Sequence, residues 1–409
     1  MQSTAGSSLP ETDLDHPRAL HALVFLPEGD DVVVGRADTD EYVVLPADGA
    51  ELIRFLTEGM TPRQAAERYA EQYGESVDIA DFLTTLEELG FLAAPGETPP
   101  ATPAPVRWQK LGRAMFSPAA WVCYGLLVAA AVFEMFRVPG LDLDRHHLFY
   151  TDYFTVIELT LFLGQFPLLL VHEGFHTLAG RRLGLRSRLG LSHRMMYIVL
   201  ETSMDGLVAV PRRRRYLPIL AGMVADVLVM ALLTLIADAT RMPGGAFPLV
   251  GRLCLALAYA TLLRLIWQFF LHLRTDLYLL ATTLLGCVDL HTTARGTLRN
   301  MVRRWTKRPL EDPEQWHPTD RKVARWYVWF MVGGYTLTAV TFVSIVVPVG
   351  WHFLTGVLSR YNGHGSVSGL IDSTTLVVLN VAQLAVVGWL SYRGRRRART
   401  ALPSSVSVG

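Results

Sequence analysis

Six apolar stretches, each near the length of a membrane span, dominate the chain. They cover residues 119–136, 155–180, 216–237, 249–271, 326–349 and 370–391. Each is close to the roughly 20 residues that a helix needs to cross the hydrocarbon core of a bilayer. Charged residues make up only 18% of the 409 residues, whereas a soluble domain usually carries about 25%. The sequence therefore predicts a mainly α-helical, polytopic membrane bundle with about six spans.

The rest of the composition excludes several classes of protein. The net charge is +1, so nothing in the total charge points to a nucleic-acid partner. Cys123, Cys254 and Cys287 form no CxxC pair, so we expect neither a disulfide framework nor a cysteine zinc site. The high apolar content also excludes a disordered chain and a coiled coil.

The basic residues between the apolar stretches define an orientation in the membrane. Arginine-rich segments at 181–188, 212–215 and 393–397 all fall on one side if the six stretches cross the bilayer in turn. Positively charged loops stay on the cytoplasmic side. We therefore expect a multi-pass protein of the cell membrane with both termini in the cytoplasm. The first 20 residues lack a basic region followed by an apolar one, and we expect no cleavable signal peptide.

Residues 17–92 have the pattern of a small soluble α+β domain. Short runs rich in Val and Leu predict strands at 19–26, 31–34 and 41–45. Helical spacing and cap residues predict helices at 48–56, from Thr61 onward and at 78–89. Residues 93–106 contain five prolines, which predicts a stiff linker and a domain boundary. A membrane domain at 107–398 would follow this linker.

The segment 195–210 is apolar but too short for a simple span. It has 16 residues between Arg194 and Arg212, which the charge pattern places on the same side. Such a segment must turn back, and Asp205-Gly206 is a hairpin turn signal. We expect a re-entrant hairpin beside a water-filled site, since non-helical backbone in a membrane must be shielded from lipid. The alternative is an amphipathic segment on the membrane surface.

A His-Glu-x-x-His sequence lies at the expected cytoplasmic end of the second apolar stretch. His172 and His176 are four residues apart, so a helix presents both imidazoles on one face. Two histidines, a third protein ligand and an open position for water are the usual arrangement of a zinc hydrolase. Glu173 is placed to accept a proton from such a water. We predict a Zn²⁺ site here, with an interior polar network that holds no metal as the alternative.

The third metal ligand is expected from another part of the membrane domain. Asp276 follows the fourth apolar stretch on the same expected side as His176, and an apolar helical run follows it. Its alternative role is a helix N-cap without metal. Glu201, Asp205 and His272 are the rival ligands. Zinc is the expected ion, and the sequence leaves other divalent metals open.

Further charged residues lie inside the apolar stretches and need a reason to be there. They are Glu158, Asp226, Arg252 and Arg264. Charged groups within a membrane usually face the protein interior and pair with one another. We expect such pairing for all four, rather than a catalytic role.

These motifs resemble the site-2 protease family of intramembrane zinc metalloproteases, and in particular its bacterial peptide zinc metalloprotease branch. Asp276-Leu277-Tyr278 is similar to the family's aspartate motif. Residues 221–226 are similar to its small-residue motif on the third span, with Asp226 where asparagine is usual. The match covers roughly residues 155–290. Two residues depart from the family pattern: Leu277 stands in place of a glycine, and Met223 in place of a proline.

The resemblance implies a hydrolase that cleaves a peptide or membrane-protein substrate. In that family the residues matching His172, His176 and Asp276 hold zinc, and the residue matching Glu173 is the general base. The hairpin expected at 195–210 lies where the family carries a re-entrant sheet thought to align the substrate. The family's PDZ insertion is not visible in this sequence.

The N-terminal region resembles a PqqD-type peptide-recognition domain, which is a small winged-helix fold. The similar features are Tyr42-Val43-Val44-Leu45, Gly49, Gly59-Met60-Thr61 and the closing Leu89-Gly90-Phe91-Leu92. The resemblance implies that the domain captures a precursor peptide as an added strand. The alternatives are a module that binds another protein and one that only stabilises the enzyme.

Three hypotheses about the function follow from these patterns. The leading one is a membrane-embedded zinc endopeptidase supplied with peptide by its N-terminal domain. The alternative is a non-catalytic membrane component for peptide binding, export or immunity, in which metal is structural or absent. An intact Glu173 favours the enzyme, since a site that only binds has no need of a base. A zinc enzyme acting on another kind of bond is a third possibility.

Overall fold

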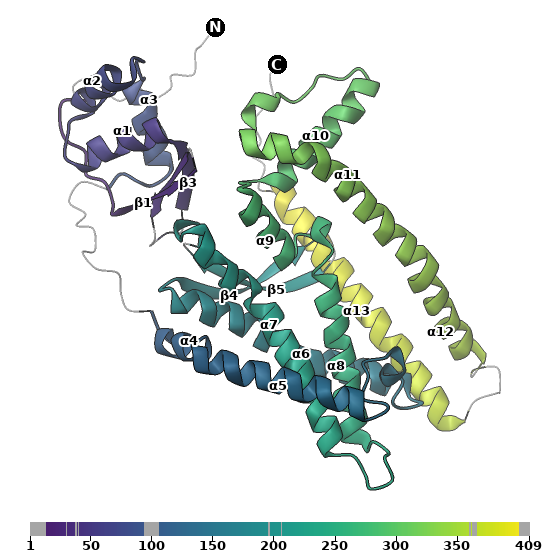
Figure 1. Ribbon diagram of the computed structural model, residues 1–409. Helices are drawn as coiled ribbons and strands as arrows, with labels where there is room; N and C mark the ends of the chain where they lie inside the picture. The colour runs from purple at the N-terminus through teal and green to yellow at the C-terminus, as the bar shows by residue number, and fades with distance from the viewer. Residues whose placement is uncertain are drawn as a thin grey trace. The chain divides into compact units, whose positions relative to one another are not determined.

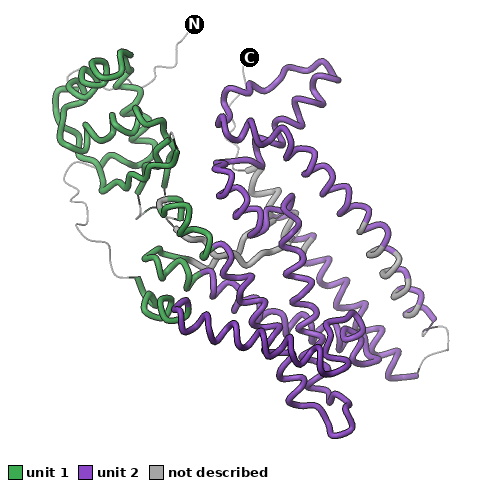
Figure 2. Tube along the Cα trace, in the orientation of Figure 1, with its two compact units in different colours: residues 1–115, 177–188, 203–218 green, residues 116–176, 189–202, 219–409 purple. Residues whose placement is uncertain are grey.

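The computed structural model describes most of the chain as helix, with one small sheet near the N-terminus (Figure 1). The described residues are 14–29, 31–36, 39, 41–93, 106–194, 197–205, 207–359, 361 and 366–400. They fall into two compact units (Figure 2). The first comprises residues 1–115, 177–188 and 203–218, and the second comprises residues 116–176, 189–202 and 219–409.

The N-terminal part of the first unit is a three-stranded antiparallel sheet followed by three helices. The strands are β1 (Leu23–Glu28), β2 (Asp31–Arg36) and β3 (Glu41–Pro46), in the order β1-β2-β3. The helices are α1 (Ala47–Thr57), α2 (Pro62–Tyr73) and α3 (Ile79–Glu88). All six elements lie close to their expected positions. The first strand begins four residues late, because Leu20 forms only an isolated bridge with Leu92.

Helix caps and apolar periodicity explain why these helices form. Thr61 and Gln64 form a reciprocal capping box at the start of α2, and Asp78 accepts two backbone N–H groups at the start of α3. The apolar faces then meet around the buried central strand β2. The residues buried there include Val34, Leu52, Ile53, Leu83 and Phe91. This core explains how so small a sheet holds its register.

An ion-pair cluster joins β1 to a later segment of the same unit. The carboxylate of Glu28 accepts hydrogen bonds from Arg212 and from Arg215, the latter at 3.0 Å. Arg215 also donates to the carbonyls of Val208 and Val210. Burial raises the pKa of Glu28, but the hydrogen bonds and positive charges of the two arginines together lower it by more, so its pKa lies below its usual value. The sheet is therefore linked to the start of the helix that Arg212 opens.

Six of the described helices are long and apolar enough to cross a membrane. Five are α5 (Pro118–Arg137), α6 (Phe154–Arg182), α7 (Arg212–Ala239), α8 (Leu249–Trp267) and α11 (Pro318–Thr341). The sixth is the first part of α13 (Val367–Thr400). Each of these helices overlaps one of the six expected stretches, so a mainly helical chain with a small N-terminal sheet is confirmed. Their length and composition indicate a multi-pass membrane protein.

The described part of this region also contains four shorter α-helices. They are α4 (Gln109–Met115), α9 (Asp276–Leu285), α10 (Leu290–Trp305) and α12 (Val347–Ser359). The axes of α9 and α10 meet at 85° across a break of a few residues. Gly286 ends α9 in the left-handed conformation at φ 71°, which a residue with a side chain adopts only at a cost. This bend turns the chain after α9 toward α11.

The hairpin between α6 and α7 differs from the expectation in its position and its turn. It consists of β4 (Arg186–Arg194) and β5 (Tyr197–Asp205), which pair with each other. The expected hairpin turn at Asp205-Gly206 is wrong, because both paired strands, β4 and β5, come before Gly206 in the sequence. Strand pairing needs backbone partners, not apolar side chains, so the polar run 186–194 serves as the first strand. Residues 195–196 and 206, and the expected linker at 94–105, lie outside the described residues.

Candidate metal centre

The His-Glu-x-x-His sequence lies near the C-terminal end of α6, as the spacing predicts. His172 and His176 are one helical turn apart, and their Nε2 atoms are 3.2 Å from each other. Both side chains are buried, and Glu173 between them is buried as well. Buried polar groups are retained only where partners or ligands satisfy them. The helix thus presents two imidazole nitrogens to a single point.

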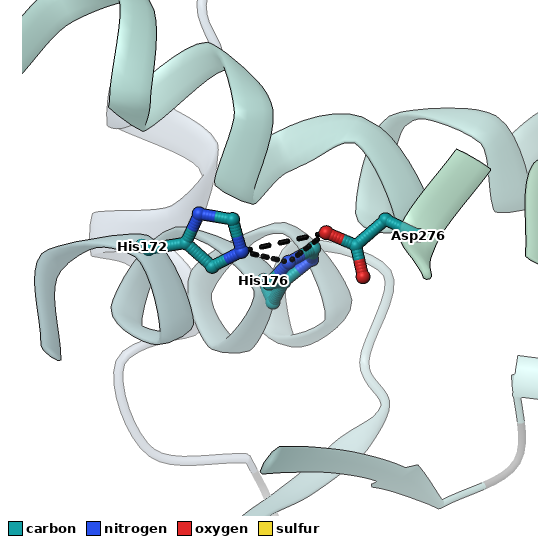
Figure 3. Close-up of side chains that lie close together, drawn as sticks. All are labelled: His172, His176 and Asp276. Carbon is teal, nitrogen blue, oxygen red and sulfur yellow. Dashed lines mark hydrogen bonds and ion pairs between the residues drawn. The ribbon is translucent and has the colours of Figure 1, made fainter. Parts of the chain in front are cut away.

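Asp276 is the first residue of α9, and its carboxylate faces the two imidazoles (Figure 3). Its Oδ2 lies 3.4 Å from Nε2 of His172 and 3.3 Å from Nε2 of His176. Gln268 holds the preceding turn, since its side chain accepts the backbone N–H of Asp276 at 3.0 Å. Thr275 occupies the N-cap position, so the N-cap role considered for Asp276 is wrong. The structure brings together the three residues expected to hold metal.

The spacing of these three atoms fits a tetrahedral ion. Zinc binds histidine nitrogen and carboxylate oxygen at roughly 2.0–2.1 Å, which places tetrahedral ligands about 3.3–3.4 Å from one another. The observed separations are 3.2, 3.3 and 3.4 Å. Oδ2 of Asp276 is buried and has no hydrogen-bond donor of ordinary geometry among the described residues. A cation between the three atoms would satisfy that oxygen.

Gly222 on α7 leaves free space at this point. A Cβ atom there would lie 2.3 Å from Nε2 of His176 and 2.4 Å from Nε2 of His172. Real Cβ atoms do not approach other atoms so closely, so any larger residue would displace the imidazoles. Gly222 therefore keeps open the volume that the two nitrogens face.

A buried polar network supports His172 from behind. Nδ1 of His172 is 3.0 Å from Oδ2 of Asp226, a residue with no exposed surface. Arg264 on α8 donates to the other oxygen of Asp226 at 2.5 Å and to Oε1 of Gln165 at 3.0 Å. Gln165 in turn donates to the carbonyl of Leu257 at 3.0 Å. An acceptor at Nδ1 keeps the ring proton there, which leaves the Nε2 lone pair free for a ligand.

The rival metal ligands lie elsewhere or outside the described side chains. His272 is buried against α11, where its Nε2 lies 3.0 Å from the hydroxyl of Thr338. The side chains of Glu201 and Asp205 are not among those described. Within the described part of the chain, His172, His176 and Asp276 are the group of three that could hold a metal ion.

The other charged residues in the apolar helices have partners. Asp226 and Arg264 pair as expected. Arg252 donates to the carbonyl of Tyr150 at 3.0 Å, and Glu158 accepts from the amide of Asn380 at 3.0 Å. Neither of these two forms an ion pair with another residue that the structure describes. The roles of Gln165 and Gln268 were not foreseen in the sequence. The sequence feature that could have identified them is an uncharged polar side chain within or at the end of an apolar stretch.

No protein-family model, curated protein or solved structure matches this chain. The resemblance to the site-2 protease family therefore depends on the motifs and their spacing. The same is true of the resemblance of the N-terminal region to a PqqD-type domain.

Proposed function

We propose that this chain is a membrane-embedded, zinc-dependent endopeptidase of the site-2 protease type. One observation supports this most strongly: the ligand atoms of His172, His176 and Asp276 lie at the mutual distances of a tetrahedral zinc site. A set of two imidazoles and one carboxylate suits Zn²⁺ better than Mg²⁺ or Ca²⁺, which prefer oxygen ligands. It also leaves a fourth position open, which is the feature that separates catalytic from structural zinc sites.

Glu173 has the position of a general base in this proposal. It directly follows His172 on α6 and is buried beside the site. Zinc would supply Lewis acidity and lower the pKa of a coordinated water toward 7. Glu173 would accept a proton from the attacking water and then deliver it to the leaving amine. Asp226 would act as a positioning residue, because it orients the ring of His172 without reaching the reacting atoms.

The substrate is proposed to be a peptide or a membrane-protein segment in extended form. The hairpin β4–β5 offers strand edges with which such a segment could pair through main-chain hydrogen bonds. The N-terminal sheet offers edges at β1 and β3, which suit peptide capture by a PqqD-like domain. Both termini are proposed to be cytoplasmic, in agreement with the arginine-rich loops.

The test compares the purified full-length protein with two variants. We expect wild type to bind about one equivalent of zinc and to cleave members of a quenched fluorescent peptide library in detergent. Glu173→Gln should keep the zinc and lose cleavage, because an amide cannot accept the proton. His176→Ala should lose both. Zinc measured by mass spectrometry and cleavage measured by fluorescence separate these outcomes.

The same experiment distinguishes the competing functions. If wild type binds zinc but cleaves no peptide, and Glu173→Gln behaves like wild type in both assays, the non-catalytic peptide-binding component would be favoured. Full zinc occupancy in His176→Ala would remove the proposed metal centre. Undiminished cleavage by Glu173→Gln would show that another group is the base.

A further inference from the structure

A pocket lies between α10 and the first turns of α11, with the short 3₁₀ helix η5 (Pro313–Gln315) at its rim. Its volume is about 580 Å³, which is within the range of small-molecule sites. The lining side chains recur at spacings of three and four residues on both helices, so each helix contributes one face. The polar and basic side chains of the lining include Thr297, Asn300 and Arg304 from α10 and Arg321, Lys322 and Arg325 from α11.

The lining of this pocket carries four positive charges and no negative one. Neither Arg304 nor the three basic residues of α11 form an ion pair with any residue that the structure describes. The nearby Glu311 is occupied by other arginines, Arg299 at 2.7 Å and Arg303 at 3.3 Å. Asp320 accepts two backbone N–H groups at the start of α10 and is likewise engaged. Asp312 and Glu314 flank Pro313 but do not line the pocket.

The walls of the pocket are fixed by contacts that do not involve its charges. The amide of Asn300 makes two hydrogen bonds with the backbone of Glu311, at 2.8 and 2.9 Å. The ring of Trp316 packs on Gly296 so closely that a Cβ atom there would lie 2.5 Å from it. The connection between α10 and α11 is thus held against α10, and the pocket is a built feature of the fold.

We propose that this pocket binds a phosphate group. Arginine offers a planar fork of donors that matches phosphate oxygens, and hydrogen bonds between charged partners are the strong ones. Like charges that share a pocket repel one another, so an anion that bridges them removes a cost as well as adding contacts. The proposal is independent of the zinc centre and stands whether or not the chain is a peptidase.

The phosphate could belong to a lipid headgroup or to a soluble phosphate compound. The structure favours the lipid in two ways. First, α11 continues from the pocket as one of the apolar helices long enough to cross a membrane. Second, Trp305, next to Arg304 at the end of α10, has 93% of its surface exposed, and tryptophan is enriched at the membrane interface. Basic pockets at the cytoplasmic ends of helices suit anionic headgroups.

The experiment uses purified full-length protein in detergent and two charge-matched variants. The test variant is Arg304→Gln/Arg325→Gln, which removes two charges from the pocket. The control is Lys307→Gln/Arg308→Gln, which removes two charges from the same connection but outside the lining. Native mass spectrometry compares retention of phosphatidylglycerol with that of phosphatidylcholine. Calorimetric titration with pyrophosphate tests the soluble source.

We expect wild type to prefer phosphatidylglycerol and the test variant to bind it about tenfold or more weakly, while the control stays within about twofold. Binding of pyrophosphate alone, with the same variant pattern, would support the site and assign a soluble ligand. No preference for either anion by wild type would overturn the proposal, and so would equal losses in the test and control variants. If the test variant does not fold, Arg304→Lys/Arg325→Lys decides: it keeps the charge and should bind at an intermediate level, whereas unchanged affinity would contradict recognition by the arginine forks.

Discussion

The N-terminal domain and the helical region around the metal centre are organised in opposite ways. The domain buries apolar side chains, such as Ile53 and Leu83, and exposes polar ones. The helical region exposes large apolar residues, with 68% of Phe162 accessible on α6, and buries Asp226 completely. Water therefore drives the assembly of the first region, whereas lipid would cover the second and leave polar contacts to specify its interior.

This difference predicts which single substitutions should change stability and which should change the metal centre. In the domain, deleting buried methyl groups should reduce stability, because burial of apolar surface is its main stabilising term. In the helical region, similar deletions on the exposed face should matter little, since lipid chains are as apolar as leucine. Substitutions in the buried polar network should instead change the properties of the metal centre.

The largest effect is expected from adding one carbon atom at the metal centre. Gly222→Ala should nearly abolish zinc binding, because its Cβ would lie 2.3 and 2.4 Å from the two Nε2 atoms. Gly174→Ala is the matched control, since a Cβ there meets nothing within 4 Å. Both variants can be assayed by equilibrium dialysis with zinc. Normal zinc affinity in Gly222→Ala would mean that the space at the site is larger than the structure shows.

A large effect on stability, and not on zinc binding, is expected in the core of the N-terminal domain. Leu83→Ala should destabilise the domain by roughly 2–5 kcal/mol, as is usual for a fully buried leucine, and leave zinc affinity unchanged. Leu163→Ala makes the same chemical change on α6 at a residue with 64% exposure, and its effect should be much smaller. Urea unfolding followed by pulse proteolysis of the full chain measures both. Equal losses for the two variants would contradict the contrast between the regions.

A smaller effect is expected in the polar network. Asp226→Asn should weaken zinc binding by about 10- to 100-fold, because the carboxylate that orients His172 and raises its basicity becomes a neutral amide. The double variant Asp226→Asn/Arg264→Gln also removes the arginine that would otherwise stay buried without its partner. We expect it to recover part of the affinity. Complete recovery would show that Asp226 serves only to pair with Arg264.

Most of the secondary structure was predictable from local patterns. The apolar stretches predicted four of the six long helices to within four residues at each end, and the Thr61 and Asp78 caps marked two helix starts of the domain. The other two predictions were less accurate, because α11 begins eight residues before the expected start and α13 ends nine residues after the expected end. The hairpin was predicted too late along the chain, because its first strand is mostly polar, with Leu189 and Leu191 as its large apolar residues. Strand pairing depends on two segments, so the sequence pattern of a single segment does not reveal it.

The candidate site was predictable where spacing alone determines geometry. The i, i+4 spacing places His172 and His176 on one helix face in any α-helix. The prediction of Asp276 as a ligand depended on its position after the fourth apolar stretch and on the family resemblance. The local sequence does not show that α9 begins opposite α6. The open space at Gly222 and the contact of Asp226 with His172 depend on how α6 and α7 pack, which is tertiary information.

The smallest effect is expected at the ion pairs between Glu28 and the start of α7. The folded-state pKa of Glu28 is below its usual value near 4.5, so its ion pairs stabilise the fold above that value. This contribution is lost as the pH falls through the lowered pKa and the carboxylate is protonated. Glu28→Gln should therefore lower the melting temperature slightly near neutral pH, by the equivalent of about 1 kcal/mol or less, since these pairs are partly exposed. The difference from wild type should vanish once the pH is below the lowered pKa of Glu28. Thermal unfolding of both proteins across this range provides the measurement, with Glu67→Gln, the same change at an exposed residue of α2, as the control. A difference that persists at low pH would mean that Glu28 acts through packing and not through its charge, which would place this contact among the apolar ones that hold the domain.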